Sequence, residues 1–207
     1  EYKISLEGNH AIQINGSSNS INDYNEYNQL EKYTSEDGTV TRYEYDDRGN
    51  RKKEIRGSQE KLYEFDEFNR LEKVTDYDGT VIDYSYDGLG NRISETITSN
   101  NDTTDITYVN DYSQDVVEVL SKTTGTSVEN YYYGNDRISS DDTIYVYDGL
   151  DNVNMILSLT GSIQKKYEYS DYGQRSLDSK TEIINNEFGY NGEAHTVDGL
   201  QYLRSRY

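Results

Sequence analysis

The chain has 207 residues, with 20 Lys and Arg against 39 Asp and Glu, which gives a formal net charge of −19. Such a charge repels phosphate backbones and anionic membrane surfaces, so we expect no nucleic-acid partner, while cations and cationic partners stay open. The longest nearly apolar stretch is too short to span a bilayer, so we expect no membrane span, and no signal-peptide pattern is visible. The absence of cysteine excludes disulfides, a thiol nucleophile and a cysteine-ligated zinc site within the sequence.

Tyrosine dominates the apolar part of the composition. Leu, Ile, Val and Phe make up about a fifth of the chain, a level that together with high net charge is typical of disorder. The 23 tyrosines change this interpretation, because each ring can bury on the order of 150–250 Å² while its hydroxyl finds a polar partner. Tyrosine also favours pleated, half-buried surfaces, so the composition predicts a sheet held largely by aromatic rings.

A pair of aromatic or β-branched residues, one residue apart, recurs along the chain, mostly at a spacing of roughly 21 residues. The pairs are Tyr43 and Tyr45, Tyr63 and Phe65, Tyr84 and Tyr86, Ile106 and Tyr108, Tyr131 and Tyr133, Tyr145 and Tyr147, Tyr167 and Tyr169, and Phe188 and Tyr190. Both members of a pair lie on the same face of a strand, because side chains alternate with a period of two. The repeat therefore predicts a tyrosine-rich face stabilised by cross-strand aromatic pairs.

Two kinds of turn separate these pairs. The first is the block Tyr-Asp-x-x-Gly-Asn-Arg, complete at residues 45–51 and 86–92, with variants at 24–30, 65–71, 147–152 and 169–175. The second is Asp-Gly-Thr, as at residues 37–39 and 78–80. Glycine supplies the positive φ of a tight turn, and aspartate or asparagine bonds its own backbone. The turn residues singled out are Asp46, Gly49, Asn50, Arg51, Asp87, Gly90, Asn91 and Arg92.

Each repeat is thus expected to supply two strands and two turns. The predicted fold class is all-β, an antiparallel meander of tandem hairpin repeats that curves, winds into a spiral or closes on itself. Little helix is expected, since no apolar stripe has the helical period. We divide the chain into an irregular or atypical repeat at 1–23, tandem repeats at 24–187 and a distinct segment at 188–207.

Arginines recur just after the turns, at positions 51, 70, 92, 137 and 175. An arginine there can stack on a tyrosine face and pair with an acid of the next repeat. We interpret this as a structural role, with a ligand-binding row of arginines as the alternative.

Residues suited to catalysis or metal binding are few. His10 and His195 are the only histidines, and no Gly-x-Ser-x-Gly motif occurs, so no enzyme is expected. The acid pairs, such as Asp46 and Asp47, are interpreted as turn formers rather than as glycosidase carboxylates. No cofactor is expected. Calcium is the one metal left open, since segments 46–50 and 76–80 offer oxygen ligands without a complete calcium-loop pattern.

The blocks at residues 45–51 and 86–92, recurring at about 21 residues, resemble the YD repeat of the Rhs family. The C-terminal runs 188–193 and 198–207 resemble the start of the Rhs repeat-associated core. The residues that carry this second likeness are Phe188, Gly189, Tyr190, Gly192, Glu193, Asp198, Gly199, Leu200, Tyr202, Leu203, Arg204, Arg206 and Tyr207.

The resemblance implies a β-sheet shell, which encloses a toxic C-terminal domain in bacterial polymorphic toxins and serves cell–cell adhesion in animal teneurins. The sequence ends before the family's downstream Tyr-Asp-Pro and Gly-Arg-Phe stretch, so it contains neither the self-cleavage site nor a toxin domain. It is also far shorter than a complete shell, so an open fragment or a self-associated assembly is expected.

The resulting hypothesis is a non-catalytic, encapsulating repeat module of an Rhs-type toxin, secreted or at the cell surface. Its expected partners are the remainder of the same polypeptide and a C-terminal cargo domain. The alternative is a carbohydrate-binding or cell-surface adhesion module, in which exposed tyrosines stack on sugar rings and Asp and Asn supply hydrogen bonds.

Overall fold

The computed structural model describes residues 2–4, 10–15, 18–113, 116–169, 173, 175–177, 186–196 and 199–203. The chain forms two compact units, one of residues 1–83 and 97–102 and the other of residues 84–96 and 103–207. Within the described ranges the regular elements are β-strands, apart from the short 3-10 helix η1 (Tyr190–Gly192). The predicted all-β meander is confirmed. None of the described segments forms a helix long and apolar enough to cross a membrane.

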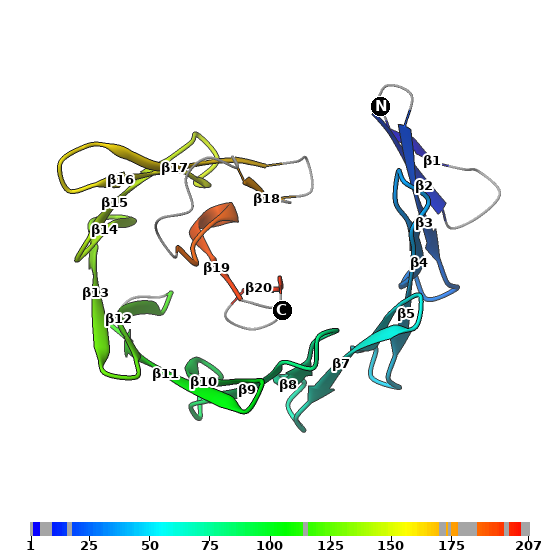
Figure 1. Ribbon diagram of the computed structural model, residues 1–207, viewed down its shortest axis with the longest axis horizontal. Helices are drawn as coiled ribbons and strands as arrows, with labels where there is room; N and C mark the ends of the chain where they lie inside the picture. Colours follow the sequence, from blue (N-terminus) through cyan, green and yellow to red (C-terminus); the bar gives the residue numbers. More distant parts are fainter. Residues whose placement is uncertain are drawn as a thin grey trace. The chain divides into compact units, whose positions relative to one another are not determined.

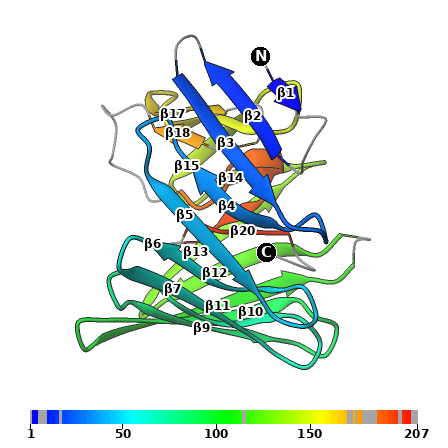
Figure 2. The same cartoon turned by 90° about the vertical axis from the view of Figure 1, so that its right-hand side faces the viewer.

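Strands of the first unit follow one another in the order of the sequence (Figures 1 and 2). Each pairs antiparallel with the next one along the chain. They are β1 (Tyr2–Ile4), β2 (His10–Asn15), β3 (Ser18–Tyr24), β4 (Leu30–Thr34), β5 (Val40–Tyr45), β6 (Arg51–Arg56), β7 (Gln59–Phe65), β8 (Leu71–Thr75) and the first residues of β9 (Val81–Tyr86).

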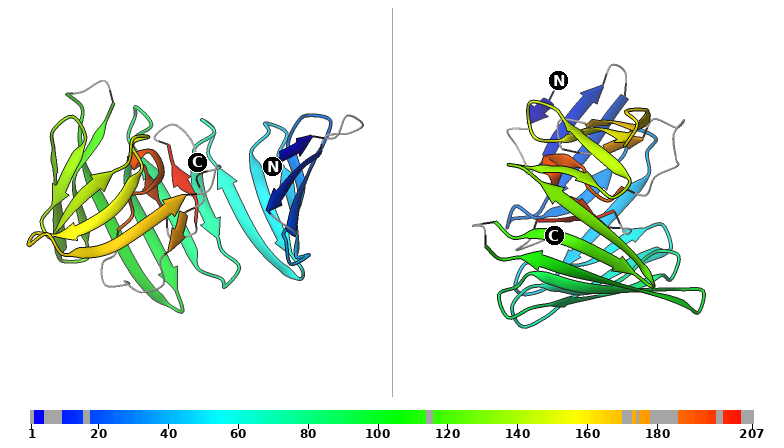
Figure 3. Two further views of the ribbon diagram at one scale, coloured as in Figure 1. Left: turned by 90° about the horizontal axis from the view of Figure 1, so that it is seen from above. Right: turned by 90° about the vertical axis from the view of Figure 1, so that its left-hand side faces the viewer.

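The second unit continues the same pattern and adds a C-terminal segment. Its strands are the remainder of β9, most of β10 (Arg92–Ser99), β11 (Asp102–Asp111), β12 (Glu118–Thr124), β13 (Ser127–Tyr133), β14 (Arg137–Ser140), β15 (Thr143–Tyr147), β16 (Val153–Ser158), β17 (Ile163–Tyr169) and β18 (Arg175–Leu177). A small separate sheet joins β19 (Ala194–His195) to β20 (Gln201–Tyr202). Strands β11 to β17 curve around η1, β19 and β20, coloured orange and red (Figures 1 and 3).

A β-bulge lies just before the second aromatic residue of a pair. The strand register shifts between Glu44 and Tyr45, and it shifts in the same place before Tyr24, Phe65, Tyr133 and Tyr147. The bulge sets the second ring opposite the first strand residue after the turn, as in the pair Tyr45 and Arg51. We call that residue the post-turn residue.

The hydroxyl of the second tyrosine ties its strand to the preceding one. Tyr45 Oη donates a hydrogen bond to the carbonyl oxygen of Leu30 at 2.8 Å. The same bond joins Tyr133 to Val119 at 2.7 Å, Tyr147 to Arg137 at 2.8 Å and Tyr169 to Val153 at 2.6 Å. The acceptors Leu30, Arg137 and Val153 are post-turn residues, and Val119 holds the equivalent place on β12. One tyrosine therefore holds both the bulge in its own strand and the hairpin that this strand forms with the preceding one.

An aspartate, or an asparagine in the first repeat, organises the described turns of the first kind. Asp46 Oδ1 accepts hydrogen bonds from the backbone N–H groups of Arg48 at 2.9 Å and Asn50 at 2.8 Å. Asp66, Asp87 and Asp148 accept the equivalent pair of bonds, and Asn25 does so in the first repeat. Gly49 takes a positive φ of 88° in this turn, a conformation that costs glycine nothing.

Replacing Asp46 by alanine removes three accepted hydrogen bonds, counting that from the Asn50 amide. We expect Asp46→Ala to lower the free energy of unfolding by about 1–2 kcal/mol, as loss of a helix cap does. Urea unfolding measures this. The neighbouring exposed acid is the matched control, since Asp47→Ala should change stability by no more than about 0.5 kcal/mol. Equal losses in the two variants would contradict the turn's dependence on Asp46.

Candidate functional site

Buried arginines stacked between tyrosines are the most distinctive feature of the sheet's inner face. Arg92, on β10, lies with its guanidinium carbon 5.8 Å from the ring centre of Tyr84 on β9 and 4.8 Å from that of Tyr108 on β11. Its Nη1 lies 3.5 Å from Glu95 Oε2, and Tyr108 donates a hydrogen bond to Glu95 at 2.9 Å. Each stack therefore combines a cation, rings from both neighbouring strands and a carboxylate.

Arg51 makes the same arrangement in the first unit. Its guanidinium lies 5.4 Å from the Tyr43 ring centre and 4.9 Å from that of Tyr63. Glu54 lies 4.0 Å from Arg51 and accepts a hydrogen bond from the Tyr63 hydroxyl at 3.1 Å. The arginine and the glutamate are three residues apart in both strands, and the block around the turn is the same.

Arg137 forms a third stack, with a different anion. It lies between Tyr131 at 5.6 Å and Tyr145 at 5.8 Å, measured to the ring centres. Ser140 replaces the glutamate at the third position along the strand and bonds to Thr143. The carboxylate near Arg137 is that of Glu118, at 3.7 Å.

The post-turn residue alternates along the chain between arginine and an aliphatic side chain. Leu71 and Val153 occupy it on β8 and β16, and each is followed three residues later by another buried aliphatic residue, Val74 or Ile156. These four side chains are at most 1% exposed. The series of post-turn residues or their counterparts reads Leu30, Arg51, Leu71, Arg92, Val119, Arg137, Val153 and Arg175. The packing pattern thus has a period of two sequence repeats.

The C-terminal segment, described at residues 186–196 and 199–203, packs onto these stacks in the second unit. The Phe188 ring centre lies 3.3 Å from the guanidinium carbon of Arg137, and the ring meets Tyr131 edge-on at 5.3 Å. Tyr202 lies 4.6 Å from the Arg92 guanidinium, and its hydroxyl accepts a hydrogen bond from the Arg92 backbone N–H at 2.9 Å. Two arginines therefore carry an additional ring supplied by the C-terminal segment.

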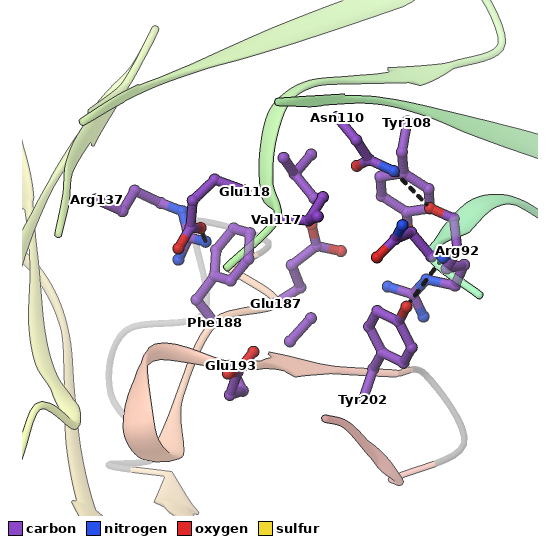
Figure 4. A pocket seen from close by; sticks show the side chains of 13 residues that line it. Arg92, Tyr108, Asn110, Val117, Glu118, Arg137, Glu187, Phe188, Glu193 and Tyr202 are labelled. Carbon is purple, nitrogen blue, oxygen red and sulfur yellow. Dashed lines mark hydrogen bonds and ion pairs between the residues drawn. The ribbon is translucent and has the colours of Figure 1, made fainter. Parts of the chain in front are cut away.

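Polar contacts fix the backbone of this segment. Val153 N–H donates to the Gly189 carbonyl at 2.9 Å, and Lys122 pairs with Glu187 at 2.7 Å. A Cβ on Gly189 would lie 2.6 Å from His195 Nε2, so a side chain there would require His195 to shift. A cavity remains between the Arg92 and Arg137 stacks, lined also by Asn110, Glu118 and Glu187 (Figure 4).

His195 takes part in this docking as a neutral ring. Its Nε2 accepts a hydrogen bond from the Tyr190 backbone N–H at 3.2 Å. Burial, with a smaller contribution from the Arg175 charge, lowers the pKa of His195 from 6.5 to about 4. The imidazole nitrogen that a general base would use is thus already an acceptor.

Comparison with known proteins identifies the repeat. The family model described as RHS Repeat matches residues 24–60 and 65–104. Residues 24–60 and 65–104 are RHS repeats. The resemblance of the turn blocks to the YD repeat is thereby confirmed. No match to a curated protein was found.

Solved structures share the fold of these RHS repeats. A chain in the crystal structure of TcdB2-TccC3-Cdc42 aligns with a TM-score of 0.57 and 15% identity, over 92% of this chain and 12% of that one. A chain in the TcdB2-TccC3-TEV crystal structure aligns with a TM-score of 0.51 and 14% identity, over 89% of this chain and 11% of that one. A Tc holotoxin pore from Photorhabdus luminescens gives 0.39 at 15% identity, over 90% and 16%. The present chain therefore spans a small part of the chains it matches.

The RHS-repeat residues singled out in the sequence occupy two environments. Buried side chains are those of Tyr63, Tyr84, Arg92, Tyr145 and Tyr167. Partly buried ones are Tyr43, Tyr45, Arg51, Phe65, Tyr86, Tyr147 and Tyr169, and Asp46, Gly49, Asn50, Asp87, Gly90 and Asn91 form the turns. In the C-terminal segment Phe188 and Gly189 are buried, whereas Tyr190, Gly192, Glu193, Leu200 and Tyr202 are partly buried and Gly199 and Leu203 exposed. Asp198, Arg204, Arg206 and Tyr207 lie outside the described residues.

Two expectations about the arginines are wrong. Arg70 stands one residue before the post-turn position, which Leu71 holds, and it pairs instead with Asp66 of its own turn at 2.6 Å. The acid beside Arg51 belongs to its own strand rather than to the next repeat. Alignment of the turn blocks 45–51 and 65–71 already places Arg70 with Asn50 and Leu71 with Arg51, so the first error comes from counting arginines instead of aligning the blocks.

The turn carboxylates considered for calcium already accept backbone hydrogen bonds. Asp46 and Asp78 bond to N–H groups of their own turns, and Asp148 does the same. The hydrogen bond from the Asn152 amide, helped by those from the backbone, holds the pKa of Asp148 below its ordinary value. Within the described ranges, no group of three or more His, Cys, Asp and Glu side chains could hold a metal ion.

Loss of the Arg92 guanidinium should be far more costly than loss of Arg70. Arg92 and Glu95 side chains are 4% and 7% exposed, so Arg92→Ala leaves a buried carboxylate without its cation. We expect a loss of about 3–5 kcal/mol in unfolding free energy. Arg70→Ala, which breaks a partly exposed pair, should cost at most about 1 kcal/mol. Chemical denaturation compares them, and similar losses would refute the special role of the post-turn arginine.

Acidification should loosen the C-terminal segment. An unfolded histidine binds a proton near pH 6.5, whereas folded His195 does so only near pH 4. The unfolded state therefore binds more protons between these values, and stability falls as the pH drops through that window. The protection factors of residues 186–196, corrected for the slower intrinsic amide exchange at low pH, should be smaller at pH 5 than at pH 7. His195→Gln should remove this difference, and a difference that persists in that variant would assign it to another group.

Proposed function

We propose that this chain is a structural, non-catalytic section of the wall of an RHS-type toxin shell, and that the wall encloses another part of the same polypeptide. The observation that supports this most directly is a series of repeat hairpins in the second unit whose inner face holds another segment of the same chain. Residues 186–196 and 199–203 lie on that face through Phe188, Tyr202 and the backbone of Gly189.

The chemistry of that face suits a containing wall. Tyrosine rings provide apolar area, while buried arginine–glutamate pairs and tyrosine hydroxyls offer polar contacts that do not depend on one partner sequence. Structures titled with TcdB2 and TccC3 share the fold, and a Tc holotoxin is among the matches. We therefore propose that this chain is part of a larger toxin polypeptide, which acts outside the cell or at its surface.

The proposed function involves no catalysis. His195 is engaged with the Tyr190 backbone, and the turn aspartates are engaged with their own turns. The proposed partners are the remainder of the RHS polypeptide and its enclosed cargo, without a bound cofactor or specific calcium.

Limited proteolysis of the natural polypeptide that carries this chain tests the proposal. We expect segments outside the repeat region to be protected from protease while the repeats are folded. Arg92→Ala, which weakens the wall, should expose them at lower denaturant concentration than Arg70→Ala does. Cleavage of those segments at the same rate in the intact polypeptide and in a version lacking residues 24–187 would contradict encapsulation.

A glycan-binding module is the second candidate, favoured by one concavity in the first unit. Tyr27, Tyr43 and Tyr45 line it together with Asn25, Gln29, Glu31 and Asp46, so rings and hydrogen-bonding groups face a common space. Tyr27 is 74% exposed and free to stack on a sugar ring. Binding on a glycan array that disappears in Tyr27→Ala would favour this function over containment.

A further inference from the structure

The arginine stacks differ in how much of the guanidinium is covered. Arg92 and Arg137 have side chains 4% and 5% exposed, and each carries a ring from the C-terminal segment. Arg51 has the same flanking rings at similar distances, but its side chain is 33% exposed. No third ring from the described part of the chain lies over it.

The two occupied stacks show how a docked ring is held. The Phe188 ring centre lies 3.3 Å from the guanidinium carbon of Arg137, while Arg137 Nη1 donates to the carbonyl of Gly192 at 3.2 Å. Tyr202 covers Arg92 and accepts the backbone N–H of the same residue. Each docked ring is thus accompanied by a backbone or hydroxyl oxygen of the segment that accepts a hydrogen bond from the arginine.

The positive charge near Arg51 suits a ligand in which an acidic residue stands next to the aromatic ring. In the docked segment Glu187 precedes Phe188 and pairs with Lys122. Beside the open stack lies Arg56, whose side chain is 51% exposed and whose guanidinium is 3.6 Å from Glu54. Arg51 and Arg56 share that one carboxylate, so the site carries an excess positive charge that a second acid can neutralise.

We propose that the exposed face of Arg51 is a receptor for an aromatic side chain of an extended polypeptide, with an acidic residue next to the ring, and that this polypeptide is the cargo enclosed by the shell. This inference rests on the proposed function and names what the wall recognises. Stacking on a guanidinium that two tyrosines already orient loses little conformational entropy, because the arginine is fixed before binding.

A photoreactive peptide tests the receptor. The probe has the sequence of residues 186–193 with benzoylphenylalanine in place of Phe188, and it is added to the full chain. We expect cross-links on β5 to β7, between residues 43 and 63, mapped by mass spectrometry. Cross-links confined to β12 to β15 would mean that the peptide only exchanges with the chain's own segment, and they would overturn the proposal, as would their absence.

Calorimetric titration with the unmodified 186–193 peptide then assigns the site. Arg51→Gln should weaken binding about tenfold, and a Phe188→Ala peptide should lose a comparable amount. Arg70→Gln is the matched control, because Arg70 ends the next turn of this kind and lies over the exposed Phe68 of its own turn, 5.1 Å from the ring centre, instead of between two tyrosines. The affinity of this variant should stay within about twofold. Arg51→Lys keeps the charge without the planar group, and it should also bind more weakly if circular dichroism shows the sheet intact. Unchanged affinity in folded Arg51→Lys or Arg51→Gln would refute the receptor.

The two proposals can fail separately. Ring-dependent peptide binding at Arg51, together with an unprotected cargo in the proteolysis experiment, would leave the receptor in place and remove the encapsulating role. A protected cargo without peptide binding at Arg51 would do the reverse.

Discussion

A guanidinium buried between tyrosine rings of two neighbouring strands is the interaction on which the rest of this sheet depends. Burying an arginine in a thin sheet is costly unless its charge and hydrogen-bond donors are satisfied. Here the rings of Tyr84 and Tyr108 cover the two faces of Arg92, and Glu95 supplies the counter-charge. The same glutamate accepts the Tyr108 hydroxyl, so removal of any one partner leaves another buried group unsatisfied. The stack is thus a cooperative unit that joins three strands.

Alternation of these units with aliphatic ones explains how a chain poor in leucine and valine forms a core. Strand β8 places Leu71 and Val74 where β6 places Arg51 and Glu54, so aliphatic and ionic layers alternate between tyrosine-bearing strands. The second tyrosine of each pair adds a hydroxyl bond back to the preceding strand, as Tyr45 does to Leu30. The C-terminal segment uses the same chemistry, since Phe188 completes a stack that its own strands leave open on one side. A sheet built in this way can bind another polypeptide segment without a dedicated pocket.

Much of this architecture could be predicted from the sequence, because the signals are local. The paired aromatic residues predicted the strands and their inward faces, and the Asp-x-x-Gly-Asn block predicted the turn that Asp46 organises. The strand register could not be predicted, since the bulge before Tyr45 shifts the ladder by one residue and sets Tyr45 opposite Arg51. The equivalence of Leu71, and not Arg70, with Arg51 was predictable, because the blocks 45–51 and 65–71 align them. The glutamate three residues after the arginine was a readable signal that was missed. The docking of Phe188 on Arg137 depends on contacts far apart in the sequence, which spacing alone does not encode.

A double-mutant cycle on Arg92 and Glu95 tests the central claim most directly. Strand β8 shows that Leu and Val fit the same two places, so Arg92→Leu and Glu95→Val are introduced singly and together, and urea unfolding gives the free energies. If the two residues act as one buried unit, each single variant should lose several times more stability than the double variant, with a coupling of at least about 2 kcal/mol. Losses that simply add would contradict the account, because they would show that arginine and glutamate stabilise the sheet independently.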